Sequence, residues 1–173
     1  MKTAHELGIT PAEKEALLWV RSALASGAIP IAEEDEDGDW IGEGPGFNMS
    51  VSSSRRGCGT VGCIGGWMAA FLSNRAEAIE RYGFDSDSSN ALDYVRHRRS
   101  PALHHLFHPL RDNADIQMEG PNGPLDVDWG VIAASDAIKA IDNFTSTGDA
   151  DWPHVLIPYF TLPDVLADVP AEL

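Results

Sequence analysis

Cysteine is scarce in this chain of 173 residues, which has only Cys58 and Cys63. Small secreted domains that rely on disulfides carry several cysteine pairs, so the sequence excludes that class. Residues 1–6 lead into a helix signal and not into the apolar core of a signal peptide. These observations predict a cytoplasmic protein with reduced thiols.

Positive charge is also scarce, because 12 Lys and Arg stand against 27 Asp and Glu, for a formal net charge of -15. A general nucleic-acid binder needs cations that displace counterions from phosphates, and docking on anionic membranes also needs cations. The scarcity of Lys and Arg therefore argues against direct nucleic-acid binding and against docking on such membranes. No apolar run approaches the roughly 20 residues that span a bilayer. With 43% hydrophobic residues, the chain has the length and composition of one globular domain, residues 1–173.

Helical periodicity dominates the rest of the sequence. We predict a mainly α-helical, compact domain of four to five helices, near residues 11–26, 64–82, 88–99, 102–107 and 134–147. Thr10 and Glu13 form a capping-box pattern at the first start, and Gly27 and Gly148 follow two helix ends. Residues 112–128 are expected to form a loop. The tail, residues 151–173, is apolar but rich in proline, and we expect it to wrap the helices with little regular structure.

Residues 28–57 depart from the helical pattern. Six of the seven residues from 33 to 39 are acidic. Two short extended pieces joined by an acidic turn fit this composition, and so does an acidic loop without strands. The sequence therefore predicts a short β-hairpin or an acidic loop inserted between helices.

A glycine-rich segment surrounds Cys63 at an expected helix start. A helix N-terminus lowers the pKa of a thiol, so Cys63 is the candidate catalytic nucleophile. Gly62, Gly65 and Trp67 are candidates for ligand contact, because glycine permits close approach. Structural packing is the competing interpretation, since a cysteine also packs as a small apolar residue.

Residues 96–111, here called the basic segment, hold four Arg, four His and no acid. Such a cluster in an acidic protein suggests a site for a small anion or an acidic protein surface. Its candidate ligand-binding residues are Arg96, Arg98, Arg99, His104 and His108. The alternative is that the segment pairs with the acidic run of residues 33–39, in the same chain or in a neighbouring copy.

His104 and His108 lie four residues apart, which is a metal-ligand spacing on a helix. The run His104–His108 is similar to the zinc-protease pattern His-Glu-x-x-His, but His105 replaces the Glu that serves as general base. A structural zinc bound by Cys58, Cys63, His104 and His108 is a weak alternative. We predict no metal and no cofactor.

Five tryptophans are many for a chain of this length. Most tryptophans belong to a core or its edge. Trp40 and Trp129 lie beside expected loops, so they are the better candidates for ligand contact.

Several short motifs resemble a group of small uncharacterised proteins of bacteriophages and bacterial genomes. These are Asn48-Met49, the Cys-Gly-Thr-x-x-Cys-Ile-Gly-Gly-Trp run of residues 58–67, Leu106-Phe107, and the Thr-Gly-x-x-x-Trp run of residues 147–152. Ala133-Ala134 departs from the Thr-Pro that often stands there, and the long acidic run is unusual. The resemblance implies a phage or accessory-gene setting, and it transfers no catalytic or binding residue.

Three hypotheses about function follow. The first is a non-enzymatic intracellular binding protein that holds a small anionic ligand or a protein partner, as a counter-defence or host-modulating factor would. The second is a cysteine-dependent hydrolase with Cys63 as nucleophile and a histidine as base. The third is a structural or assembly protein that forms a homo-oligomer through its opposite charges.

Overall fold

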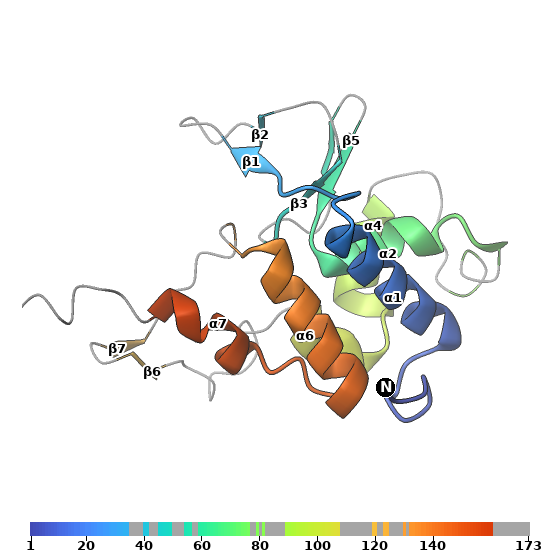
Figure 1. The fold of residues 1–173 in the computed structure, drawn as a ribbon. Helices are drawn as coiled ribbons and strands as arrows, with labels where there is room; N and C mark the ends of the chain where they lie inside the picture. Colours follow the sequence, from blue (N-terminus) through green and yellow to red (C-terminus); the bar gives the residue numbers. More distant parts are fainter. Residues whose placement is uncertain are drawn as a thin grey trace, which may run out of the picture.

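The computed structural model describes residues 1–34, 40–41, 45–49, 54–56, 59–76, 79, 81, 89–107, 119–120, 123–124, 130 and 132–160. This part of the chain is mainly helical, as predicted. Helices α1 (Pro11–Ala25), α2 (Ile64–Leu72) and α6 (Ala134–Thr147) form the centre, with α1 packed on both of the others (Figure 1). None of the described helices is long and apolar enough to cross a membrane.

The start of α1 matches the predicted capping box. The Glu13 N–H donates to Thr10 Oγ1 over 3.1 Å, and the Thr10 N–H donates to Glu13 Oε2 over 2.8 Å. This exchange satisfies two of the N–H groups that a helix start leaves without partners. At the other end, Gly27 adopts φ +73° directly after the helix, in the left-handed region that favours glycine.

Short helical turns follow α2 on one side of the core. They comprise α4 (Ser89–Asp93), a π-helical turn (Tyr94–Arg98), a 3-10 turn (Pro101–Leu103) and α5 (His104–Phe107). The predicted helices 88–99 and 102–107 thus exist as short consecutive turns. Helix α2 ends at Leu72, where Ser73 and Asn74 form a turn. The described residues 76, 79 and 81 are helical again, so the helix predicted to run to 82 is interrupted.

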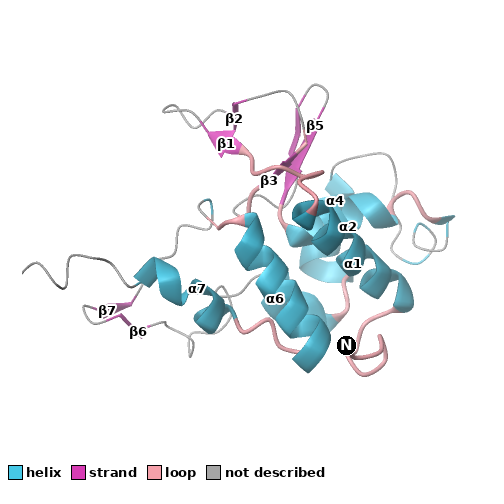
Figure 2. Ribbon diagram, viewed as in Figure 1, coloured by secondary structure: helices cyan, strands magenta, loops and turns pink. Residues whose placement is uncertain are grey.

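Small β elements lie beside the helices (Figure 2). Strands β1 (Glu33–Glu34) and β2 (Trp40–Ile41) pair antiparallel, so the hairpin alternative for this acidic segment is confirmed. A second sheet has the order β3-β5-β4, in which β5 (Gly59–Gly62) pairs parallel with β3 (Gly46–Phe47) and antiparallel with β4 (Ser54–Arg56). This sheet leads directly into α2, with Cys63 as the N-cap residue.

Two expectations for the C-terminal part are wrong for the residues that the structure describes, whereas residues 161–173 of the tail lie outside them. Residues 152–160 form a regular helix, α7 (Trp152–Phe160), which packs on α6. Trp152, Val155 and Leu156 bury one side of α7, and this amphipathic spacing outweighs the prolines at positions 153 and 158. Within the expected loop, β6 (Glu119–Gly120) and β7 (Gly123–Pro124) form a minimal antiparallel pair.

Glu13 connects α1 by hydrogen bonds to the short helical turns of residues 94–100. Its side chain is 0% exposed. It accepts hydrogen bonds from the Ser100 N–H over 2.8 Å, from Ser100 Oγ over 2.5 Å and from the Tyr94 hydroxyl over 3.3 Å. Because a buried carboxylate is costly without donors, these bonds fix the position of residues 94–100 on α1.

Candidate functional site

Cys63 lies at the start of α2, as predicted, but its environment is closed. The side chain is 3% exposed and belongs to the hydrophobic core. Burial raises the pKa of the Cys63 thiol, although the N–H groups of Gly65 and Gly66 donate to the sulfur and oppose this effect. The expected lowering of this pKa is therefore wrong, since loss of solvent outweighs the helix N-terminus.

Gly65 serves packing. A Cβ atom placed on Gly65 would lie 2.8 Å from Val95 Cγ2 and 2.9 Å from Phe107 Cδ2. Gly62 is also buried, and its carbonyl accepts from the Asn48 N–H over 3.3 Å. Gly65 therefore lets α2 approach Val95 and Phe107, which agrees with the packing interpretation of the motif.

In the described part of the basic segment, some side chains pair with nearby residues and others are exposed to solvent. Arg98 Nε lies 2.5 Å from Asp93 Oδ2, and the Arg99 guanidinium contacts Arg96 O and His104 Nδ1. Arg96, His97 and His105 are exposed. Cations are favourable here, because residues 96–98 occupy the last turn of a helical segment.

The described residues do not assemble the zinc set that the sequence offered as a weak alternative. Cys58 and His108 lie outside them, as do residues 35–39, Trp129 and Arg111. Among the residues that the structure describes, no group of three or more His, Cys, Asp and Glu is placed to hold a metal ion. Of the four proposed ligands, Cys63 is in the core and His104 contacts Arg99.

A pocket of about 300 Å³ opens between α1 and the end of α2. We call it the aromatic pocket. Its lining comprises Trp19, Trp67, Ala70, Phe71, Asn74 and Arg75. Among the described lining residues, Trp67 is the one that the sequence proposed for ligand contact. The side chain of Trp40, a further candidate, lies outside the part of the chain that the structure describes.

Two rows of side chains build the aromatic pocket. Glu15 and Trp19 are four residues apart on α1, and Trp67, Phe71 and Arg75 follow the same spacing on and after α2. Residues four apart share one face of a helix, so Glu15 and Trp19 lie on one face of α1, and Trp67 and Phe71 lie on one face of α2. Trp19 is the common wall, because its ring centroid lies 6.3 Å from that of Trp67 and 5.2 Å from that of Phe71.

The floor and the rim of the aromatic pocket differ in polarity and exposure. Trp67 is 8% exposed, and its Nε1–H donates to the Gly46 carbonyl over 3.0 Å. Trp19 is 39% exposed, an unusual state for a residue that usually buries most of its surface. At the rim, Arg75 Cζ lies 4.7 Å above the Phe71 ring, and Arg75 pairs with Glu15.

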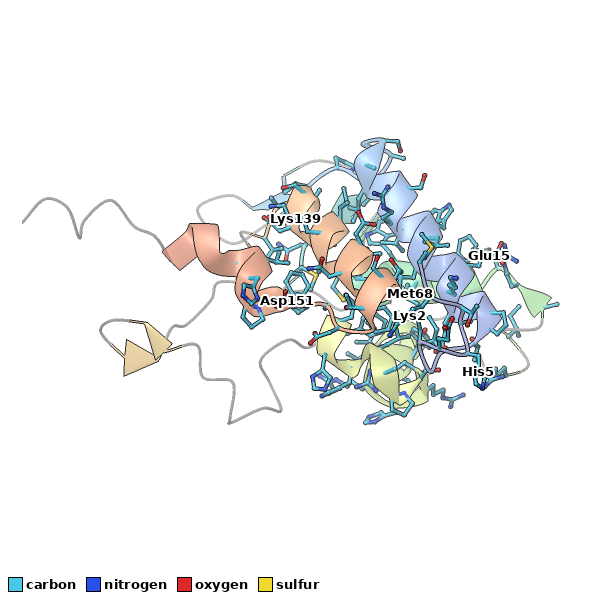
Figure 3. All side chains as sticks on the ribbon, turned by 60° about the horizontal axis from the view of Figure 1, so that its bottom comes forward. Lys2, His5, Glu15, Met68, Lys139 and Asp151 are labelled. Carbon is cyan, nitrogen blue, oxygen red and sulfur yellow. The ribbon has the colours of Figure 1, made fainter. Side chains whose placement is uncertain are left out.

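Figure 3 shows Glu15 on the side of α1 that faces away from α6, where Lys139 is labelled. The aromatic pocket therefore lies on the opposite side of α1 from its packing with α6. Sequence reasoning assigned Trp19 to the apolar face of the first helix and did not single out Phe71, Asn74 or Arg75. The signal that could have found them is the aromatic-aromatic-cation row at positions 67, 71 and 75.

Comparisons of the chain with known protein families, with curated proteins and with solved structures find no match.

Proposed function

We propose that the chain is a non-enzymatic binding protein that takes the ring of a small ligand in the aromatic pocket. The observation that carries this proposal is the half-exposed Trp19 opposite the fixed indole of Trp67. Small-ligand sites are concave, largely apolar or aromatic, and carry few polar groups, with volumes from roughly 300 Å³ upward. The aromatic pocket has this composition, with Asn74 and Arg75 as its polar members.

The chemistry of the lining supports binding over catalysis. Its described members are aromatic, aliphatic, amide and guanidinium side chains, which supply neither a nucleophile nor a general base. The buried Cys63 thiol is a poor nucleophile at neutral pH, because its raised pKa keeps it protonated. These points weigh against the cysteine-hydrolase hypothesis.

Calorimetric titration with 2-naphthamide, a neutral two-ring probe, tests the proposal. We expect saturable binding to the unchanged protein and a loss of about tenfold or more in Trp19→Ala, since stacking on one aromatic side chain contributes about 1–3 kcal/mol. Ile31→Ala is the matched control, because Ile31 is 42% exposed and lies outside the lining. Absence of saturable binding, or equal binding in Trp19→Ala, would overturn the proposal.

A second candidate function is docking on an acidic protein partner through the basic segment. The exposed Arg96 favours it, because no carboxylate in the described part of the chain pairs with its guanidinium. We expect Arg96→Glu to abolish partner capture from a host lysate at 50 mM salt, whereas Lys139→Glu should leave capture unchanged. Equal capture by both variants would contradict this candidate.

The setting that we propose for this function rests on the resemblance in the sequence. The resemblance to small phage and bacterial proteins supports an accessory role in the cytoplasm, with host modulation or counter-defence as the purpose of binding. Assembly into a homo-oligomer through residues 33–39 and the basic segment is the remaining alternative, and light scattering across a salt series tests it.

A further inference from the structure

We infer that the aromatic pocket selects a planar ring that carries a carboxylate. This carboxylate replaces Glu15 as the ionic partner of Arg75. The inference rests on the proposed function, since it specifies the ligand of the same pocket. It arises from the contacts of Arg75, which lines the pocket while touching both an aromatic ring and an acid.

The guanidinium of Arg75 is already held in place. It lies over the Phe71 ring at 4.7 Å, within the roughly 6 Å at which a cation is attracted to an aromatic face. The backbone supports this position, because the Arg75 N–H donates to the Leu72 carbonyl over 3.0 Å. A planar fork with five N–H donors therefore stands at the edge of the ring-binding surface, and such a fork matches a carboxylate.

Glu15 is a weakly held partner of this fork. The side chains of Arg75 and Glu15 are 42% and 52% exposed. Exposed ion pairs contribute little to stability, because water and salt screen both charges. Exchange of one carboxylate for another costs correspondingly little, since Arg75 keeps an anionic partner and the displaced Glu15 returns to water.

The ring and the carboxylate would act together. The Phe71 ring is close to both requirements, since its centroid lies 5.2 Å from that of Trp19 and 4.7 Å from Arg75 Cζ. A ring against Trp19 thus brings a carboxylate on its edge toward the guanidinium. The net charge of -15 opposes an anion at long range, but at physiological ionic strength this repulsion is screened beyond about 8 Å.

The experiment compares 2-naphthoate with 2-naphthamide, which have the same rings and differ in charge. We expect the unchanged protein to bind 2-naphthoate about tenfold more tightly, as hydrogen bonds to charged groups allow. Arg75→Met should remove this preference, so that 2-naphthoate binds no more tightly than 2-naphthamide to that variant. Glu15→Gln should strengthen 2-naphthoate binding about threefold, because it removes the competing carboxylate.

The matched control is Arg21→Met, which removes an α1 cation that pairs with Asp142 at 2.8 Å outside the lining. It should leave the preference for 2-naphthoate unchanged. Equal affinity for both probes, or an unaltered preference in Arg75→Met, would overturn the inference while Trp19-dependent binding upholds the proposed function. Absence of binding by both probes would overturn the two together.

Discussion

The two sides of α2 come from the same stretch of sequence, but one side is tightly packed and the other lines an open pocket. On one side, Gly65 lies so close to Val95 and Phe107 that a single added carbon would collide with them. On the other side, Trp67 and Phe71 face an open volume of about 300 Å³. Cys63 and Gly65 of the Cys-Gly motif thus belong to the closed side, whereas Trp67 at the end of the motif and Phe71 beyond it form the open one.

The largest effect is expected on the closed side, from Glu13→Ala. The change leaves the Ser100 N–H, the Ser100 hydroxyl and the Tyr94 hydroxyl without their buried acceptor. We expect the free energy of unfolding to fall by about 3 kcal/mol, since each buried group without a partner costs about 1–3 kcal/mol. Urea denaturation measures this effect, and Thr10→Ala is the control that removes the helix cap, worth about 1 kcal/mol. Equal losses in both variants would contradict the tie to residues 94–100.

Gly65→Ala is the second test of the closed side. The added methyl would lie 2.8 Å from Val95 Cγ2, so α2 or its neighbours must shift. We expect a loss of about 2 kcal/mol, typical of an overpacked core. Adding Val95→Ala to this variant should recover part of the loss, which a double-mutant cycle in urea detects. Strictly additive losses would show that the two positions do not compete for space.

The buried thiol of Cys63 makes the free energy of unfolding depend on pH. Because burial raises the pKa of this thiol, the native state holds its proton more tightly than the unfolded state does. Stability should therefore be full below the unfolded thiol pKa of about 8.5 and fall as pH rises above it. Urea denaturation from pH 7.5 to 10 in a Cys58→Ala background should show this decline, and Cys63→Ala should flatten it. A decline of equal slope in both proteins would contradict the burial of a neutral thiol.

The smallest effect on stability is expected on the open side. Trp19 is 39% exposed and anchors no hydrogen bond that the structure records. We expect Trp19→Ala to lower the free energy of unfolding by about 1 kcal/mol, below the 3–5 kcal/mol of a buried tryptophan. Trp67→Ala is the comparison, because its indole is buried and bonded to the Gly46 carbonyl. Similar losses in the two variants would show that Trp19 is structural.

The sequence predicted the parts of the fold that local chemistry determines. The capping box of Thr10 and Glu13, the left-handed Gly148 after α6 and the central position of α2 follow from residue type and spacing. The helix of residues 152–160 was missed, because prolines at 153 and 158 outweighed the apolar spacing in the prediction. Proline is tolerated near a helix start, which the position of Pro153 illustrates.

The candidate site was less predictable than the fold. Charge and glycine patterns drew attention to the basic segment and to Cys63, whereas the aromatic pocket depends on two helices meeting at a given rotation. Periodicity places Trp19 at the edge of an apolar face, but it does not say which helix lies beside that edge. The ion pair between Glu15 and Arg75 joins residues 60 positions apart, so no local sequence pattern predicts it.

The most direct test of the account follows backbone amide and indole N–H signals by NMR while 2-naphthoate is added. The account predicts that the indole signals of Trp19 and Trp67 and the amides of Phe71 and Arg75 shift with one binding constant, while the amides of Gly65 and Arg96 stay in place. Shifts concentrated at Gly65 or at Arg96, with the indole signals of Trp19 and Trp67 unmoved, would contradict it.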